Sequence, residues 1–129
     1  MALYAASLFN DGICIDSRCD SWPGWSILLL GGLALFGSPA NATWLANPAL
    51  FASWGLLIGS QWRAALIAAI VALAGGASFL LFDGVVSSES GGLSSITGTA
   101  IGYWLWLSSM AVACFGAALS LRQSGAGAR

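Results

Sequence analysis

The sequence predicts an integral membrane protein of all-α class, a bundle of three to four transmembrane helices. Residues 62–82 and 101–121 each form an apolar stretch of about 21 residues, with charge only at the ends. A helix rises about 1.5 Å per residue, so each stretch is about 31 Å long, which matches the hydrocarbon thickness of a bilayer. Composition agrees, because 58% of the residues are hydrophobic and 7% are charged, whereas soluble domains carry about 25% charged residues.

The first predicted helical segment, residues 22–37, is the weakest of the four. Its strictly apolar part is about 14 residues long, or about 21 Å as a helix, which is short for a crossing. A glycine pair at 31–32 and a Ser-Pro step at 38–39 weaken it further. Two alternatives stay open: this segment crosses the bilayer, or it is re-entrant and leaves on the side where it entered.

The second segment, residues 47–60, begins with a helix-start signal. Asn47 fits the N-cap position and Pro48 fits the first helical position. The third and fourth segments are the two long apolar stretches, residues 62–82 and 101–121. These two predict crossings most directly.

Residues 83–100 connect the third and fourth segments. The connection is rich in Gly and Ser, which is typical of a flexible loop, although long loops also carry binding elements. All four segments fit one membrane-embedded domain over residues 1–129, because the chain is too short for a second domain of similar size.

The arginines orient the predicted bundle. Arg63 lies in the turn between the second and third segments, and Arg122 and Arg129 follow the fourth. Cytoplasmic loops of membrane proteins carry an excess of basic residues. We therefore expect the Arg63 turn and the C-terminus in the cytoplasm and the 83–100 loop outside. The N-terminus is then inside with four crossings and outside with three.

Aromatic side chains gather near the predicted ends of the crossings. Amphipathic aromatic rings favour the headgroup level of a membrane. We expect five of them to lie at the membrane–water interface: Trp44, Trp62, Tyr103, Trp104 and Trp106.

Small residues recur at every fourth position of the third segment, at Ala64, Ala68, Ala72 and Gly76. Residues four apart lie on one side of a helix, and small side chains let a neighbouring helix approach closely in lipid. This predicted helix-packing face serves either contacts within the chain or an interface with a second subunit.

Cys14 and Cys19 lie in an acidic, polar segment. Outside the cytoplasm they are candidates for a disulfide, whereas in a cytoplasmic tail they stay free thiols. The chain has no histidine, and two thiols alone are too few for a zinc site. We expect no metal site, and we expect Cys114 within the fourth segment to pack as a small apolar residue.

Several functions are disfavoured by the charge pattern. The two long segments carry no ionisable residue between their ends, although proton-coupled transport and charged selectivity rings require one. No histidine is present for acid–base chemistry, and a net charge of −1 provides no basic patch for nucleic acid. We expect no enzyme, no catalytic or cofactor-binding residues, and no nucleic-acid partner.

Two strings, WLANP at residues 44–48 and GYWLW at residues 102–106, resemble small uncharacterised bacterial inner-membrane proteins. The resemblance implies a multi-pass helical protein of the inner membrane, and no known activity comes with it. The first functional hypothesis is a non-catalytic small subunit or accessory factor of a membrane complex. The alternatives are an oligomeric channel subunit and a membrane-embedded binder of lipid or another hydrophobic ligand.

Overall fold

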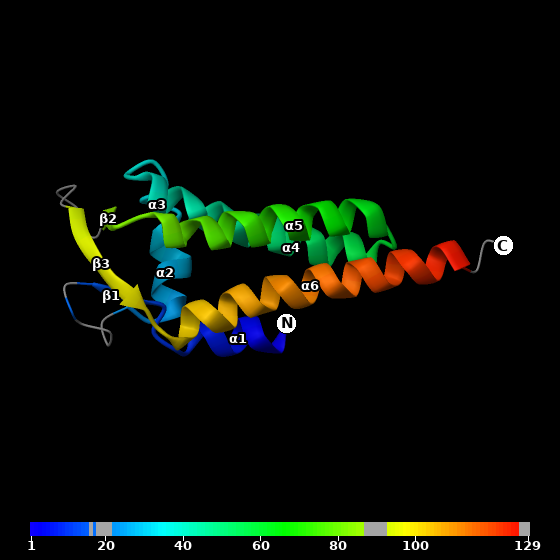
Figure 1. Ribbon diagram of the computed structural model, residues 1–129, viewed down its shortest axis with the longest axis horizontal. Helices are drawn as coiled ribbons and strands as arrows, with labels where there is room; N and C mark the ends of the chain where they lie inside the picture. Colours follow the sequence, from blue (N-terminus) through cyan, green and yellow to red (C-terminus); the bar gives the residue numbers. More distant parts are fainter. Residues whose placement is uncertain (16, 18–21, 87–92, 127–129) are drawn as a thin grey trace.

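Three helices dominate the fold, and they run side by side along its long axis (Figure 1). In the computed structural model, which describes residues 1–15, 17, 22–86 and 93–126, these are α4 (Ala46–Ile58), α5 (Trp62–Ser78) and α6 (Ile101–Ala126). Helix α5 contacts both α4 and α6 extensively, whereas α4 and α6 touch each other little. The stretches Trp62–Leu81 and Ile101–Ala126 are long and apolar enough to cross a membrane.

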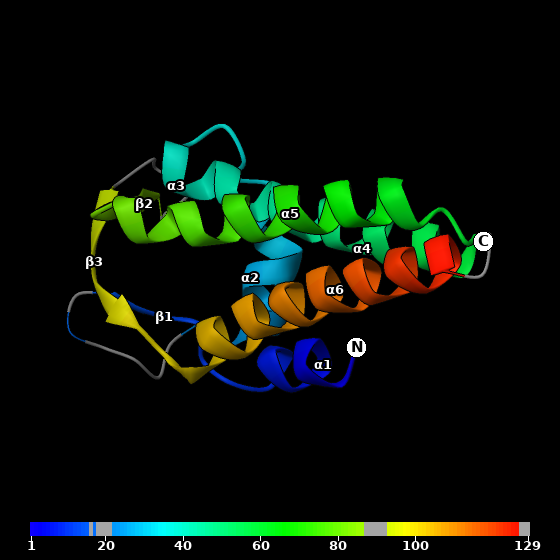
Figure 2. The same cartoon turned by 45° about the vertical axis from the view of Figure 1, so that its right-hand side comes forward.

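Three shorter α-helices and two 3-10 turns complete the described helical part. Helix α1 (Ala2–Leu8) packs along α6, and α2 (Gly24–Gly31) lies transverse to the long helices, as the views in Figures 1 and 2 agree. Helix α3 (Pro39–Ala42) and the 3-10 turn η1 (Thr43–Leu45) lead without a break into α4. A second 3-10 turn, η2 (Phe79–Leu81), extends α5.

A small antiparallel sheet closes one end of the bundle (Figure 1). Its strands are β1 (Ile13–Ile15), β2 (Gly84–Val86) and β3 (Leu93–Thr99), in the order β1-β3-β2. The prediction that the chain is purely helical, with residues 83–100 as a loop, is therefore wrong. The loop was predicted from the Gly and Ser content of this segment, but β3 also contains Ile and Thr, which favour strands. In addition, β3 pairs with β1, which lies far away in the sequence.

Several predicted helix boundaries also need correction. Of the predicted segment 22–37, only Gly24–Gly31 is α-helical, and turns follow up to residue 37. Asn47 is not the N-cap of the second segment, because α4 begins at Ala46 and continues directly from η1. The fourth segment extends past its predicted end at residue 121, since α6 reaches Ala126. These are boundary errors, and the four predicted segments all contain helix.

The charged side chains that the structure describes divide between the two ends of the bundle. At the sheet end, Asp11 pairs through its backbone with Pro23, and Asp83 directly precedes β2. At the opposite end, the turn before α5 and the last turns of α6 line one shallow cleft, which includes Arg63. Arg122 belongs to the same end of α6. The described acidic residues and the described arginines therefore lie at opposite ends.

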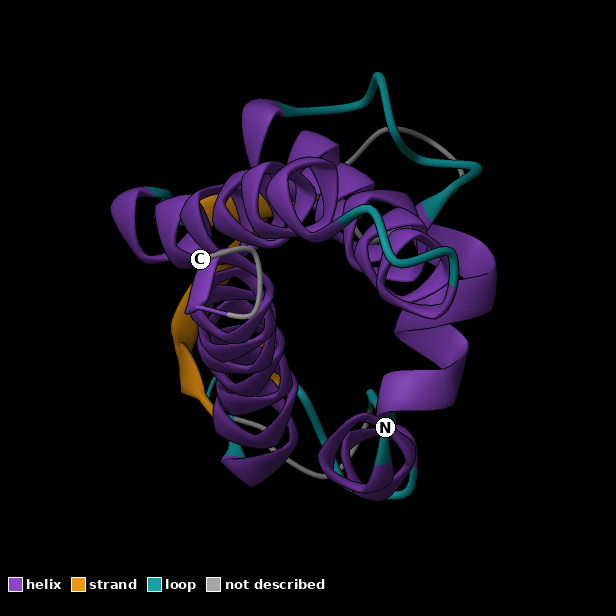
Figure 3. Cartoon of the chain, turned by 90° about the vertical axis from the view of Figure 1, so that its right-hand side faces the viewer, coloured by secondary structure: helices purple, strands orange, loops and turns teal. Residues whose placement is uncertain are grey.

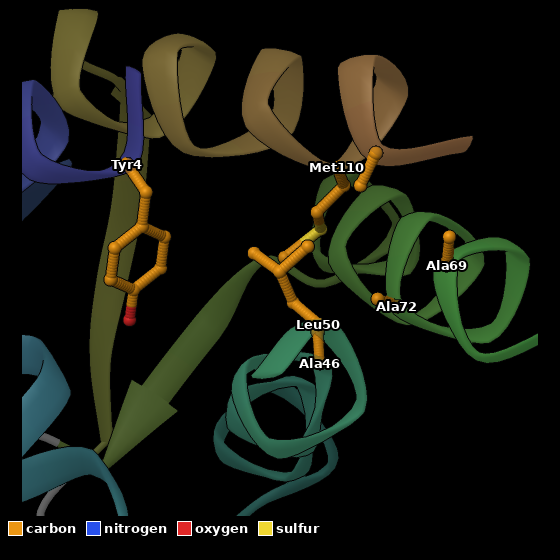
Figure 4. Close-up of a cluster of buried hydrophobic side chains, with 7 residues drawn as sticks. Tyr4, Ala46, Leu50, Ala69, Ala72 and Met110 are labelled. Carbon is orange, nitrogen blue, oxygen red and sulfur yellow. The ribbon is translucent and has the colours of Figure 1, made fainter. Parts of the chain in front are cut away.

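The core between α4, α5 and α6 is filled by side chains of complementary size. Leu50, Ala72 and Met110 are each 0% exposed, and Figure 4 shows them meeting at the centre, with Tyr4 approaching from α1. Small residues on α5 allow the larger side chains of α4 and α6 to fit, so both of these helices pack closely against α5.

The predicted packing face of α5 coincides only in part with the residues of this helix that are buried. Ala72 and Gly76 are buried, whereas Ala64 and Ala68 are only partly buried. The buried positions nearer the start of the helix are Ala65 and Ala69. A spacing of four residues rotates by about 40° per step around a helix with 3.6 residues per turn, so an unbroken series of fours drifts off one face. Spacings of four, three and four keep the buried residues on the same side.

Candidate ligand cavity and its polar network

Asn47 joins three helices at the sheet end of the core. Its Oδ1 accepts hydrogen bonds from the Tyr4 hydroxyl at 3.0 Å and from Trp106 Nε1 at 2.8 Å. Its Nδ2 donates to the Trp44 carbonyl at 3.1 Å. Because an indole N–H can only donate, Trp106 fixes which side of the amide is oxygen. Asn47 is 5% exposed, so α1, α4 and α6 meet at a buried amide.

Two further aromatic residues tie neighbouring elements together. The Tyr103 hydroxyl donates to the Gly76 carbonyl at 3.0 Å, which links α6 to α5. Trp44 Nε1 donates to the Leu28 carbonyl at 2.9 Å, which links η1 to α2. In the described part of the chain, every buried side-chain nitrogen or oxygen has a hydrogen-bond partner. Each of these buried atoms therefore has at least one hydrogen-bond partner, as is usual for buried polar groups.

Aromatic contacts surround this network. The ring of Tyr103 lies 5.6 Å from that of Phe79 and 5.9 Å from that of Trp106, centroid to centroid. The ring of Tyr4 meets that of Trp54 edge-on at 5.5 Å. These separations are within the range in which aromatic pairs attract each other beyond simple burial. Burial also raises the pKa of Tyr4 to about 12, so its hydroxyl stays a neutral hydrogen-bond donor.

A cavity of about 120 Å³ lies beside this network. Figure 3 shows the arrangement of the helices in a view along the long helices. The residues that line the cavity belong to the half of the molecule that carries the sheet. Its walls come from α1, β1, α2, α3, η1, η2 and the first turns of α4 and α6. The aromatic and larger aliphatic lining residues are Tyr4, Leu8, Ile13, Ile27, Leu28, Trp44, Phe79, Tyr103 and Trp106.

The polar lining of the cavity is sparse and uncharged. It consists of Ser7, Asn41, Thr43 and Asn47, besides the two tyrosine hydroxyls and the two indole nitrogens. Among the residues that the structure describes, no Asp, Glu, Lys or Arg lines the cavity. An apolar hollow with a few convergent polar groups is the usual character of a small-molecule site.

Close backbone contacts hold the cavity walls in place. The Gly102 N–H at the start of α6 donates to the Asp11 carbonyl at 2.9 Å. A Cβ at position 102 would come within 2.6 Å of the Asp11 carbonyl oxygen and 2.7 Å of the Asn10 carbonyl oxygen. Only glycine allows this approach, because it has no Cβ. The segment after α1 is thereby fixed against α6.

The predicted interfacial aromatics divide into interior and exterior positions. Tyr103 is 4% exposed and Trp106 is partly buried, and both bond inside the bundle. Trp44 is partly buried and hydrogen-bonded as well. Tyr103 faces the interior of the bundle, where its hydroxyl finds an acceptor on α5, and its position at the membrane–water interface stays a prediction. Trp104 is 50% exposed, and Trp62 is partly exposed at the start of α5.

The cysteines differ in state. Cys14 is disulfide-bonded and lies in β1, whereas Cys114 in α6 is a free thiol. Cys19 lies outside the described residues, so the pairing of Cys14 with Cys19 stays a prediction. Over the described ranges, no group of three or more His, Cys, Asp or Glu residues is placed to hold a metal ion.

Sequence reasoning missed the central roles of Asn47 and Tyr4. Asn47 stands in an otherwise apolar stretch, and a polar residue in such a stretch must find partners when it is buried. Its apparent fit to a helix start concealed this signal. Tyr4 gave no signal of its own, because its partner Asn47 is 43 residues away.

A scan of the chain against models of protein families gave no match, and searches of curated proteins and of solved structures gave none either. The functional argument for this chain therefore depends on its own geometry.

Proposed function

We propose that this chain is a multi-pass protein of a bacterial inner membrane. The support is the length and apolar character of α5 and α6, together with large apolar side chains on their outer surfaces. Ile67, Val112 and Phe115 are between 57% and 67% exposed, which suits contact with lipid. Residues 39–58 form a continuous helical stretch of about 20 residues, or about 30 Å, and provide a third crossing.

In this proposal the arginine end is cytoplasmic and the sheet is external. The separation of the described arginines from the described acidic residues supports this orientation. Helix α2 is re-entrant, because its first residue, Gly24, bonds to the Asn10 carbonyl near the sheet, and α3, which follows it, contacts β2. The C-terminus is cytoplasmic, and the disulfide-bonded Cys14 in β1 is external, where disulfides persist.

We further propose that the protein is non-catalytic and binds a lipid group or another hydrophobic small molecule in the cavity. The cavity itself is the observation that carries this proposal, since it is apolar, lined by aromatic rings and about 120 Å³ in volume. A pore through the single chain is disfavoured, because Leu50, Ala72 and Met110 fill the space between the three long helices.

Two adjacent leucines on α2 give a matched test. Leu28 lines the cavity, whereas Leu29 does not and is 66% exposed. We expect wild-type protein and the Leu29→Trp variant, extracted in mild detergent, to carry a bound small molecule in native mass spectrometry. Leu28→Trp places a larger ring in the cavity and should lose that molecule.

Equal occupancy in both leucine variants would contradict binding in this cavity. Thermal unfolding of both variants should accompany the measurement, because an unfolded Leu28→Trp variant would lose its ligand for a trivial reason. If Leu28→Trp is unstable, Leu28→Phe makes a smaller addition at the same wall and should lower the occupancy in proportion.

A second candidate function, an accessory subunit of a membrane complex, is favoured by one surface of α5. Ala64 and Ala68 are small and remain partly exposed beside the buried face, and small residues let a helix from another chain approach closely. We expect Ala68→Leu to leave the stability of the isolated protein unchanged. If a partner chain packs on this surface, the variant should lose its co-purification in mild detergent.

A further inference from the structure

We propose that the cavity selects an uncharged ring that carries a hydroxyl group. This inference rests on the proposed ligand-binding function and specifies the chemistry of the ligand. It follows from three properties of the described lining: its lack of charge, its remaining hydrogen-bonding capacity and its size.

The lack of charge decides the first part of the inference. No Asp, Glu, Lys or Arg from the described chain lines the cavity. A carboxylate, phosphate or ammonium group that entered it would lose its hydration without gaining a partner of opposite charge, which is costly. The cavity therefore excludes fatty-acid carboxylates and phospholipid head groups, and it accepts neutral molecules.

The hydrogen-bonding capacity decides the second part. Asn47 Oδ1 already accepts two hydrogen bonds, and Nδ2 uses one of its two hydrogens for the Trp44 carbonyl. The second Nδ2 hydrogen has no partner within the described residues. The Tyr4 hydroxyl has given its hydrogen to Asn47, so its oxygen can only accept.

The site thus offers a donor, the Asn47 amide nitrogen, and an acceptor, the hydroxyl oxygen of Tyr4, which is hydrogen-bonded to the same amide group. A hydroxyl group both donates and accepts, so it can take a hydrogen bond from Asn47 and give one to Tyr4. A carbonyl group would leave the Tyr4 oxygen unused, and a hydrocarbon would leave both groups unused. Among neutral polar groups, an alcohol or phenol hydroxyl satisfies both protein groups with a single atom.

Size and shape decide the third part. An engineered apolar protein cavity of about 150 Å³ binds benzene, so a cavity of about 120 Å³ has room for one small ring. Rings attract each other in offset and edge-on arrangements, and five aromatic residues line this cavity: Tyr4, Trp44, Phe79, Tyr103 and Trp106. The ring is either a free phenol-type molecule or the hydroxylated head of a lipid whose tail extends between the helices.

Three probes of similar size separate these properties. Phenol carries the hydroxyl, toluene lacks it, and benzoate adds a charge. Binding to the detergent-purified protein is measured by ligand-observed NMR. Each probe also partitions into the detergent, to the same extent in both variant samples. The signal from binding in the cavity is therefore the difference between the Leu29→Trp variant and the Leu28→Trp variant. We expect phenol to bind most tightly, toluene about fivefold to thirtyfold more weakly for one or two lost hydrogen bonds, and benzoate not at all.

The variant Tyr4→Phe tests the role of the hydroxyl acceptor. The variant should lower the affinity for phenol about fivefold and leave the affinity for toluene unchanged. Retained toluene binding also shows that the variant is folded. If toluene equals phenol in the wild type, or if benzoate binds as well as phenol, the hydroxyl and charge arguments are overturned, while the ligand-binding function stands. If no probe and no co-purified molecule depends on Leu28, both proposals fail.

The source of the ring is resolved by a second comparison in lipid nanodiscs. An alkylated phenol, 4-octylphenol, competes with phenol for the cavity. If 4-octylphenol binds more tightly than phenol and the gain depends on Leu28, the ligand is a lipid head group with its tail between the helices. If 4-octylphenol binds no more tightly than phenol, the ligand is a free phenol-type molecule.

Discussion

Replacing Asn47 by alanine should destabilise the bundle more than any comparable change at its surface. The substitution removes three hydrogen bonds, and it leaves the hydroxyl of Tyr4 and the indole nitrogen of Trp106 without an acceptor. Both donors are in the interior, where an unsatisfied polar group is expensive. The change should therefore loosen the contacts among α1, α4 and α6 together.

The expected magnitude follows from the number of bonds. Interhelical side-chain hydrogen bonds in a membrane protein average about 0.6 kcal/mol and reach about 1.7 kcal/mol. Three bonds give a loss of about 2 kcal/mol, rising to about 5 kcal/mol if each is at the upper end. Asn10→Ala is the matched control, because the Asn10 amide donates only to Ala6 of the preceding helix. It should cost less than about 1 kcal/mol.

The assay is reversible unfolding in mixed micelles, with double-mutant cycles that pair Asn47→Ala with Tyr4→Phe and with Trp106→Phe. Removing a donor as well as its acceptor should cost less than the two single changes together, with a coupling on the order of 1 kcal/mol in each cycle. Strict additivity in both cycles, or a cost for Asn47→Ala no larger than that for Asn10→Ala, would refute the role assigned to this amide.

Three further predictions concern packing, topology and the cysteines. Ala72→Leu should lower the free energy of unfolding by about 1–3 kcal/mol through overpacking. Ile67→Leu, on the exposed side of the same helix, should change it by less than about 0.5 kcal/mol. Thermal unfolding measures both, and equal effects would contradict the assigned face. A topology reporter fused after Arg122 should read as cytoplasmic and one inserted between β2 and β3 as external, and the reverse result would invert the proposed orientation. With Cys114 replaced by alanine, an impermeant maleimide should label Cys14 in intact cells only after reduction, and labelling that also requires permeabilisation would place β1 inside.

The helical part of this fold was predictable because its signal is local. Apolar runs of bilayer length define α5 and α6 without reference to any other part of the chain. The packing face of α5 was only half predictable, since a helix of 3.6 residues per turn rotates Ala64 and Ala68 away from the buried side.

The sheet and the cavity were not predictable in the same way. Strand β1 has three residues and depends on β3 for its hydrogen bonds, so neither strand is defined by its own sequence. Asn47, Tyr4 and Trp106 likewise meet only after α1, α4 and α6 have packed. Non-local contacts of this kind depend on tertiary structure, and local propensity carries little information about them.

The pairing of β1 with β3 also constrains the order of biogenesis. Ile13 pairs with Thr99, so β1 has no partner strand until the chain up to Thr99 has left the ribosome. During that interval the α4–α5 hairpin, whose helices are neighbours in sequence, is free to insert first. The segment that leads into β1 can bond to Gly102 through Asp11 only after the start of α6 has been made. A chain stalled before residue 93 would lack β3 and α6, and its N-terminal strand would remain open to oxidation or proteolysis.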